Sequence, residues 1–179
     1  ARKSSIITSN RALHSDNQGD MAETSILLPH AVLTAGDSDA PLYDTAIRIE
    51  DDRIAEIGPA AGILAVHPGA EIVDLADCVV MPGMAFCHNH PAYDNVNSLA
   101  EIDLKHPPTT LTLIAAKNAE LLLHCGYTIA VGAGAAHYID VALRDSINRG
   151  LIPGPRILAC GRDVISTGDS VDAHPKWWN

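Results

Sequence analysis

Aromatic residues are scarce in this 179-residue chain: they make up only 4% of it, and Phe occurs once. A folded core must therefore be built mainly from Ile, Leu, Val and Ala. Hydrophobic residues nevertheless reach 47% and charged residues 19%, which excludes a disordered chain and indicates a globular one.

Positive charge is also in short supply, with 12 Lys and Arg against 22 Asp and Glu and a net charge of -10. An acidic surface repels phosphate backbones, so we expect no nucleic acid partner. No apolar run approaches the roughly 18 residues of a membrane span, so we expect no membrane partner. The basic residues 1–3 are not followed by an apolar region, which argues against a secretory signal.

The cysteines lack the pairing that would make a metal or redox motif. None of the four forms a CxxC pair, and each stands in an apolar run. This pattern predicts buried free thiols in a reducing, cytoplasmic setting. The four residues are Cys78, Cys87, Cys125 and Cys160.

The first half of the chain has the pattern of a small β domain. We interpret residues 1–24 as a leader or flexible arm, with Met21 as a candidate original start, and residues 25–83 as a β-sandwich-like domain. Residues 45–50 and 53–57 alternate between apolar and polar around Asp51-Asp52, which predicts a β-hairpin. Further short strands are expected at residues 26–28, 31–33, 71–74 and 78–81.

From residue 84 to residue 179 the pattern changes to alternating strands and helices. Such an order predicts a parallel sheet with right-handed crossovers. Three strands of an eightfold barrel and half of a doubly wound sheet both fit it. The apolar run at residues 84–87 favours a central strand. The expected elements are a strand at 84–87, a helix at 109–125, a strand at 127–131, a helix at 139–149 and a strand at 155–159.

The candidate metal-binding motif is His88-Asn89-His90, at the expected C-terminal end of the first parallel strand. Active sites in α/β folds form at that end. Residues i and i+2 of a strand point to the same side, so two imidazoles can bind one divalent metal ion. Two solvent-facing loop histidines are the alternative interpretation.

The surrounding motifs resemble the amidohydrolase superfamily. Pro82-Gly83, followed by an apolar run and then by His88 and His90, resembles the signature of that family. Residues 119–128, 144–150 and 152–161, the last with Gly154-Pro155-Arg156, resemble its next helix and strand steps, and residues 44–57 resemble its N-terminal hairpin. The prolidase, imidazolonepropionase and aryl-urea or amide hydrolase-like branch is the most similar. The implied fold class is α/β, with a small N-terminal β-sandwich-like domain plus the first three βα units of a TIM-type (β/α)8 metal-dependent hydrolase barrel.

This resemblance implies a hydrolase that acts on a C–N bond of an amide, urea, cyclic amide or amidine through a metal-activated hydroxide. His88 and His90 would be metal ligands for one or two divalent ions, with Zn²⁺ expected first and Fe²⁺ or Mn²⁺ as alternatives. The catalytic Asp and the other ligands belong to later strands of the family and are expected outside this chain. Phe86 and Val131-Gly132 stand where many relatives have Asp and Arg-Asp, which implies a different substrate pocket.

Three further residues are candidates for contact with a small-molecule substrate. Tyr93 follows the two histidines, His137 follows the second strand, and His174 follows the third. For each of them a packing or solvated role is the alternative.

The resemblance also predicts a partner. Three barrel strands leave two open edges, so this chain alone is expected to be inactive. We expect a second polypeptide that carries strands four to eight, in a homo- or hetero-oligomer. The alternatives are a non-catalytic half-barrel scaffold and a metal-dependent oxygenase on the same fold.

Overall fold

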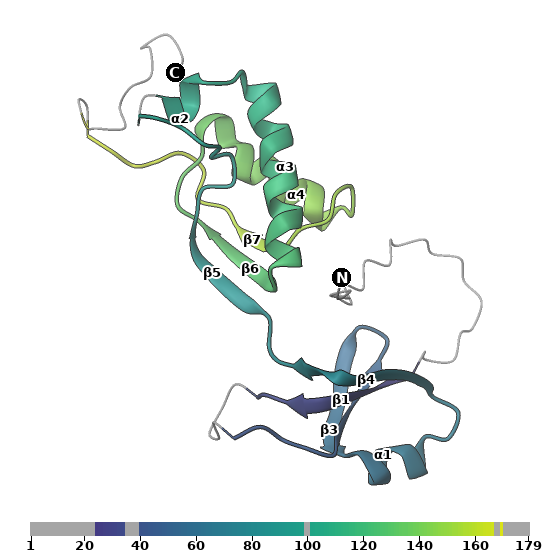
Figure 1. The fold of residues 1–179 in the computed structure, drawn as a ribbon. Helices are drawn as coiled ribbons and strands as arrows, with labels where there is room; N and C mark the ends of the chain where they lie inside the picture. The colour runs from purple at the N-terminus through teal and green to yellow at the C-terminus, as the bar shows by residue number, and fades with distance from the viewer. Residues whose placement is uncertain (1–23, 35–39, 99–100, 167–168, 170–179) are drawn as a thin grey trace, which may run out of the picture. The chain divides into compact units, whose positions relative to one another are not determined.

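The computed structural model describes residues 24–34, 40–98, 101–166 and 169. Within these residues the chain forms two compact units, one ending at Pro82 and the other beginning at Gly83 (Figure 1). Of the predicted arm at residues 1–24, residues 1–23 lie outside the described residues, whereas Thr24 begins the first strand. His174 and the rest of the C-terminal segment from residue 170 also lie outside them. No helix in the described ranges is long and apolar enough to cross a membrane.

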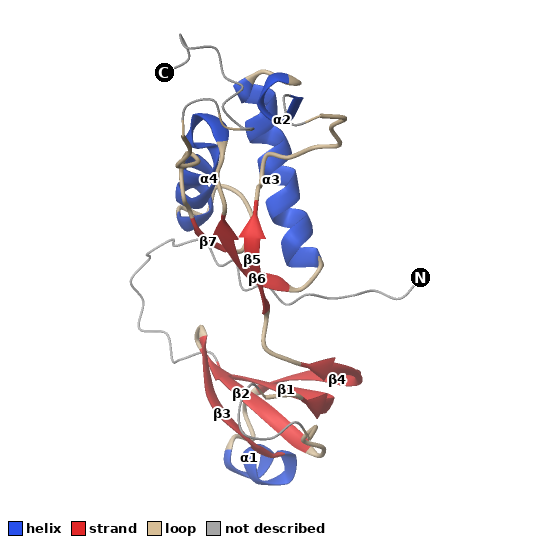
Figure 2. Ribbon diagram, turned by 90° about the vertical axis from the view of Figure 1, so that its left-hand side faces the viewer, coloured by secondary structure: helices blue, strands red, loops and turns tan. Residues whose placement is uncertain are grey.

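The N-terminal unit is one mixed sheet with a helix against it (Figure 2). Strands β2 and β3 form an antiparallel hairpin, β1 pairs with β2 antiparallel, and β1 pairs with β4 in parallel, giving the order β3-β2-β1-β4. Buried Ile26 and Ala46 pack with Ile63 of the helix on one side of the sheet. The elements are β1 (Thr24–Val32), β2 (Thr45–Glu50), β3 (Arg53–Pro59), α1 (Ala60–Val66) and β4 (Glu71–Val80).

This unit confirms the predicted hairpin and corrects three other expectations. Pro29 does not split the first strand, because β1 continues through a register shift between Pro29 and Ala31. The two short strands expected after residue 70 are one continuous strand, β4. Helix α1 was not among the expected elements, because its single buried residue, Ile63, gave too little periodicity to reveal it. The described residues of this unit form one sheet, so a sandwich is not confirmed.

The C-terminal unit is a three-stranded parallel sheet with the order β5-β6-β7 (Figure 2). Helices α3 and α4 connect successive strands, contact one another, and bury one shared core that includes Leu111, Leu143 and Ile157. Three strands in sequential order occur in both barrels and doubly wound sheets, so barrel closure stays a prediction. The elements are β5 (Met84–Asn89), α2 (Glu101–Leu104), α3 (Pro108–His124), β6 (Tyr127–Gly132), the short 3-10 helix η1 (Ala136–Tyr138), α4 (Ile139–Asn148) and β7 (Arg156–Leu158).

The predicted helix boundaries in this unit are confirmed within a residue or so. Pro108 occupies the first turn of α3, and Gly126 follows the helix with φ +89°. Gly150, with φ +70°, ends α4 in the same way. At both glycines the backbone adopts the left-handed conformation that side chains disfavour.

One expectation about burial is not confirmed and another is wrong. Within the described residues β6 is central and β5 lies at the edge of the sheet, with Met84 and Phe86 each 37% exposed, so a central position of residues 84–87 is not confirmed. The four cysteines are free but exposed. Two of them lie in the strands at sheet edges, Cys78 in β4 and Cys87 in β5, so an apolar sequence context did not imply burial.

Candidate metal centre

His88 and His90 lie at the C-terminal end of β5 with their rings facing each other. Their Nε2 atoms are 3.1 Å apart, and the ring planes meet at 74°. The residue between them, Asn89, is buried, whereas His88 is exposed and His90 half-buried. The strand therefore alternates as expected and brings both imidazoles to the same side.

The spacing of the two nitrogens suits a shared metal ion. Two nitrogens bound to one tetrahedral zinc at about 2.0–2.1 Å lie about 3.3 Å from each other. The observed 3.1 Å is close to that value. The separation of the two nitrogens is therefore compatible with a shared divalent cation.

A backbone carbonyl fixes which nitrogen of His90 is available. The Nδ1 atom of His90 lies 3.0 Å from the carbonyl oxygen of Gly134, in the loop after β6. Because a carbonyl oxygen only accepts hydrogen bonds, Nδ1 carries the hydrogen in this arrangement. In the neutral ring the lone pair is then on Nε2, the atom that faces His88.

Tyr93 supports the His90 ring from its face. The two rings are stacked, with centroids 4.3 Å apart and planes within 5° of parallel. The segment that carries Tyr93 is held by helix α3, because the Asn118 side-chain amide donates hydrogen bonds to the carbonyls of Pro91 at 2.9 Å and Tyr93 at 3.2 Å. Tyr93 thus contacts a candidate ligand, and the predicted contact with substrate stays untested.

The acidic residue Asp94 directly follows Tyr93 in the sequence. The Asp94 carboxylate lies 4.0 Å from Lys105 Nζ and 3.5 Å from His106 Nε2. The backbone hydrogen bond from Asn95 is the largest cause of a lowered Asp94 pKa, and Lys105 and His106 lower it further. These contacts favour the ionised form of the Asp94 carboxylate.

The two histidines are not joined by a third ligand within the described residues. Across residues 24–34, 40–98, 101–166 and 169, no group of three or more His, Cys, Asp or Glu side chains could hold a metal ion. His137 is exposed in η1, with φ +55°, and His174 lies outside the described residues. The structure therefore brings together His88, His90 and Tyr93 of the predicted site.

Sequence reasoning missed three residues of the C-terminal unit, two at this centre and one outside it. Asn118 holds the segment after the histidines, Gly134 provides the carbonyl that accepts from His90, and Asp140 is a fully buried carboxylate in the first turn of α4. An acidic residue at a helix start was the only sequence signal for Asp140, and it indicates helix capping rather than a site.

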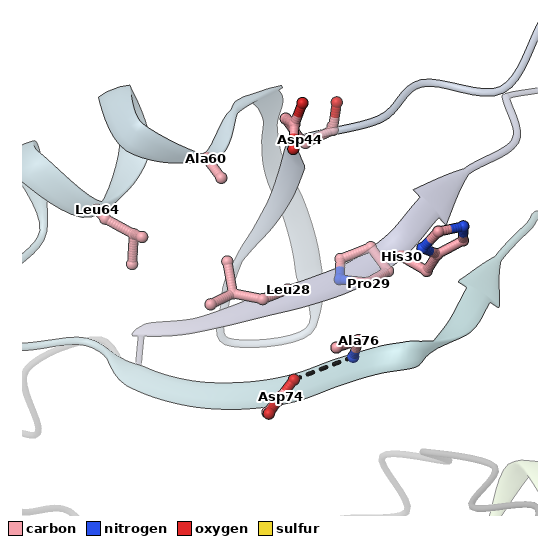
Figure 3. Close-up of a pocket in the computed structure, with 9 residues that line it drawn as sticks. Leu28, Pro29, His30, Asp44, Ala60, Leu64, Asp74 and Ala76 are labelled. Atoms are coloured by element: carbon pink, nitrogen blue, oxygen red, sulfur yellow. Dashed lines mark hydrogen bonds between the residues drawn. The ribbon is translucent and has the colours of Figure 1, made fainter.

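A separate hollow of about 390 Å³ lies in the N-terminal unit (Figure 3). Leu28, Leu64 and His30 line part of it, together with Asp44 and Asp74. Its polar groups have local partners: Asp74 Oδ1 accepts a 3.0 Å hydrogen bond from the Ala76 amide, and the His30 ring meets the ring of Tyr43 edge-on. None of the predicted site residues lines this hollow.

No family model matches the chain, but parts of it are similar to curated enzymes. It is 30% identical over 77 residues to a 5-methylthioadenosine/S-adenosylhomocysteine deaminase of Nitratidesulfovibrio vulgaris (strain DP4), covering 43% of this chain and 17% of the deaminase. It is 36% identical over 83 residues to an imidazolonepropionase of Myxococcus xanthus (strain DK1622), covering 45% of this chain and 20% of that protein.

A solved structure shares the fold. A Xaa-Pro dipeptidase with bound methionine in its active site matches with a TM-score of 0.71 and 24% identity, over 86% of this chain and 39% of the dipeptidase. The chain thus spans about a fifth of the length of the curated relatives and about two fifths of the dipeptidase.

Proposed function

We propose that this chain, whose curated relatives and structural neighbours all belong to the amidohydrolase superfamily, forms the N-terminal part of a metal-dependent hydrolase that acts on a C–N bond of a small molecule. The observation that carries the proposal is the pair of imidazoles with Nε2 atoms 3.1 Å apart, one of them oriented by the Gly134 carbonyl. Solvated loop histidines would not need either feature.

In this proposal His88 and His90 hold a divalent cation through their Nε2 atoms, with Zn²⁺ expected first. When bound, the cation supplies Lewis acidity, which lowers the pKa of a water toward about 7 and polarises the substrate. The chain's own residues orient the ligands. Gly134 keeps the hydrogen on Nδ1 of His90, and Tyr93 limits rotation of that ring.

The centre requires groups beyond the two histidines, because a zinc site uses about three protein ligands when it is catalytic. We propose that these ligands, and the catalytic acid–base group, come from outside the described residues, in a complete barrel.

The C–N bond is proposed as the target on the basis of the relatives. Their names describe a deaminase, a dipeptidase and an imidazolonepropionase.

The free cysteines are in keeping with a reducing cytoplasmic setting, which we propose for the protein.

The test is hydrolysis by the protein in its natural full-length or assembled form. Metal content is measured together with turnover of a panel of dipeptides, N-acyl amides, aryl ureas and aminopurine nucleosides. The His88→Ala/His90→Ala variant is compared with His124→Ala, which removes an exposed histidine at the end of α3.

We expect bound metal and hydrolysis of at least one class, both lost in the double variant and kept in the control. Absence of metal and of any effect in the double variant would contradict the proposal and favour a scaffold. Iron with oxygen consumption would favour an oxygenase.

A further inference from the structure

Among the residues that the structure describes, one fully buried charged side chain of the C-terminal unit lies outside the candidate metal centre. Asp140 is 0% exposed and stands in the first turn of α4. Isolated burial of a carboxylate is costly, so its surroundings must compensate for the lost water. The N-terminal end of a helix does so in part, because its free N–H groups favour negative charge.

Backbone N–H groups complete the compensation and link two elements. Asp140 Oδ1 accepts from the Val141 amide at 2.9 Å, within its own helix. Asp140 Oδ2 accepts from the amides of Cys160 and Gly161, each at 2.8 Å. One carboxylate therefore fastens the segment after β7 to the start of α4.

That segment in turn holds the peptide that orients His90. The Ala135 amide donates a 2.8 Å hydrogen bond to the carbonyl of Gly161. The carbonyl of the same peptide unit, on Gly134, accepts from His90 Nδ1 at 3.0 Å. The peptide between Gly134 and Ala135 is thus held at both ends, by Gly161 on one side and by His90 on the other.

Three glycines lie along the hydrogen-bonded path from Asp140 to His90 and leave room for the Asp140 carboxylate and the two turns. A Cβ on Gly132 would lie 3.1 Å from Asp140 Oδ2, tighter than nine in ten real Cβ contacts. Gly134 and Gly161 have φ values of +125° and +81°, which side chains rarely adopt. The turns at Gly134 and Gly161 therefore favour glycine, and the Asp140 carboxylate leaves little room for a side chain at position 132.

We propose that Asp140 is a positioning residue for His90: through the 160–161 segment and the Gly134–Ala135 peptide it fixes the ring so that Nε2 faces the metal. The metal centre in this inference rests on the proposed function. The hydrogen-bonded path from Asp140 to His90 is observed independently of it. If Asp140 only capped α4, its loss would lower the stability of the fold and leave the His90 ring unchanged.

The test uses Asp140→Asn in the natural full-length or assembled protein. This variant keeps the size of the side chain but replaces one acceptor oxygen with an amide that can only donate. The matched control is Asp145→Asn, which alters a carboxylate on the same helix that is 41% exposed and paired with Arg144. Zn²⁺ affinity is measured by competition with a chromophoric chelator. The His90 tautomer is read from ¹⁵N chemical shifts of the metal-free protein.

We expect Asp140→Asn to bind Zn²⁺ about tenfold more weakly or worse, in the range usual for groups that orient metal ligands. Its His90 signal should change from the Nδ1–H tautomer to a mixture, and Asp145→Asn should match wild type in both measurements. A folded Asp140→Asn with wild-type affinity and an unchanged tautomer would overturn the inference.

A second variant covers the case in which Asp140→Asn does not fold, and the tautomer measurement covers the case in which no Zn²⁺ binds. If Asp140→Asn does not fold, Asp140→Glu takes its place, because it keeps the charge but displaces the oxygens by one methylene. An unchanged His90 tautomer in that variant would also overturn the inference. If wild type binds no Zn²⁺, the proposed function fails, and the tautomer measurement alone still decides the role of Asp140.

Discussion

Replacing Tyr93 by Ala should weaken metal binding, whereas replacing it by Phe should not. The Tyr93 and His90 rings are stacked at 4.3 Å with nearly parallel planes, so the contact uses the ring and not the hydroxyl group. An aromatic pair of this kind contributes about 0.5–1.5 kcal/mol beyond its buried area. If that energy restrains His90 in the orientation that binds metal, its loss weakens affinity about two- to twelvefold.

The assay is Zn²⁺ competition with a chelator, followed by kcat and KM for the best substrate of the panel. Tyr93→Phe keeps the stacked ring and serves as the matched control. We expect it to retain wild-type metal affinity and turnover. The reasoning would be refuted if both variants lost turnover equally while metal affinity stayed at the wild-type level, since the hydroxyl group would then act on the substrate.

Two further predictions concern stability. Leu143→Ala removes a core side chain that is 2% exposed and should lower the free energy of unfolding by about 2–5 kcal/mol. The control Leu113→Ala, at a position 72% exposed, should change the free energy of unfolding by less than about 0.5 kcal/mol. Both variants are compared with wild type by denaturant titration. The lowered pKa of Asp94 means that its ionised form stabilises the folded state above the unfolded value of 3.8, and this contribution is lost as the pH falls through the lower folded pKa. Thermal unfolding of Asp94→Asn should therefore differ from wild type near pH 7 and converge with it in strong acid; a constant difference at all pH values would contradict the assignment.

Local signals in the sequence were sufficient to bound the two long helices of the C-terminal unit. Helix α3 could be bounded because Pro108 and Gly126 have conformational preferences that act without any tertiary contact. The orientation of His88 and His90 to one side followed from the two-residue period of a strand. Such features depend on neighbours in sequence and can be predicted from them.

Features that depend on distant contacts could not be predicted in this way. The edge position of β5 is set by which strands pair with it, and an apolar run does not encode that pairing. The link from Asp140 to Gly161 joins residues 21 positions apart, and the bond from His90 to Gly134 joins residues 44 positions apart. Helix α1 depends on the burial of Ile63 against the sheet, which also lies beyond local pattern.

X-ray absorption at the zinc edge tests the central claim most directly. The protein in its natural full-length or assembled form is loaded with Zn²⁺ and compared with the His88→Ala/His90→Ala variant. We predict imidazole scattering at about 2.0–2.1 Å from the metal in wild type, with the contribution of two imidazoles lost in the variant. An identical zinc environment in the two proteins would contradict the assignment of His88 and His90 as metal ligands.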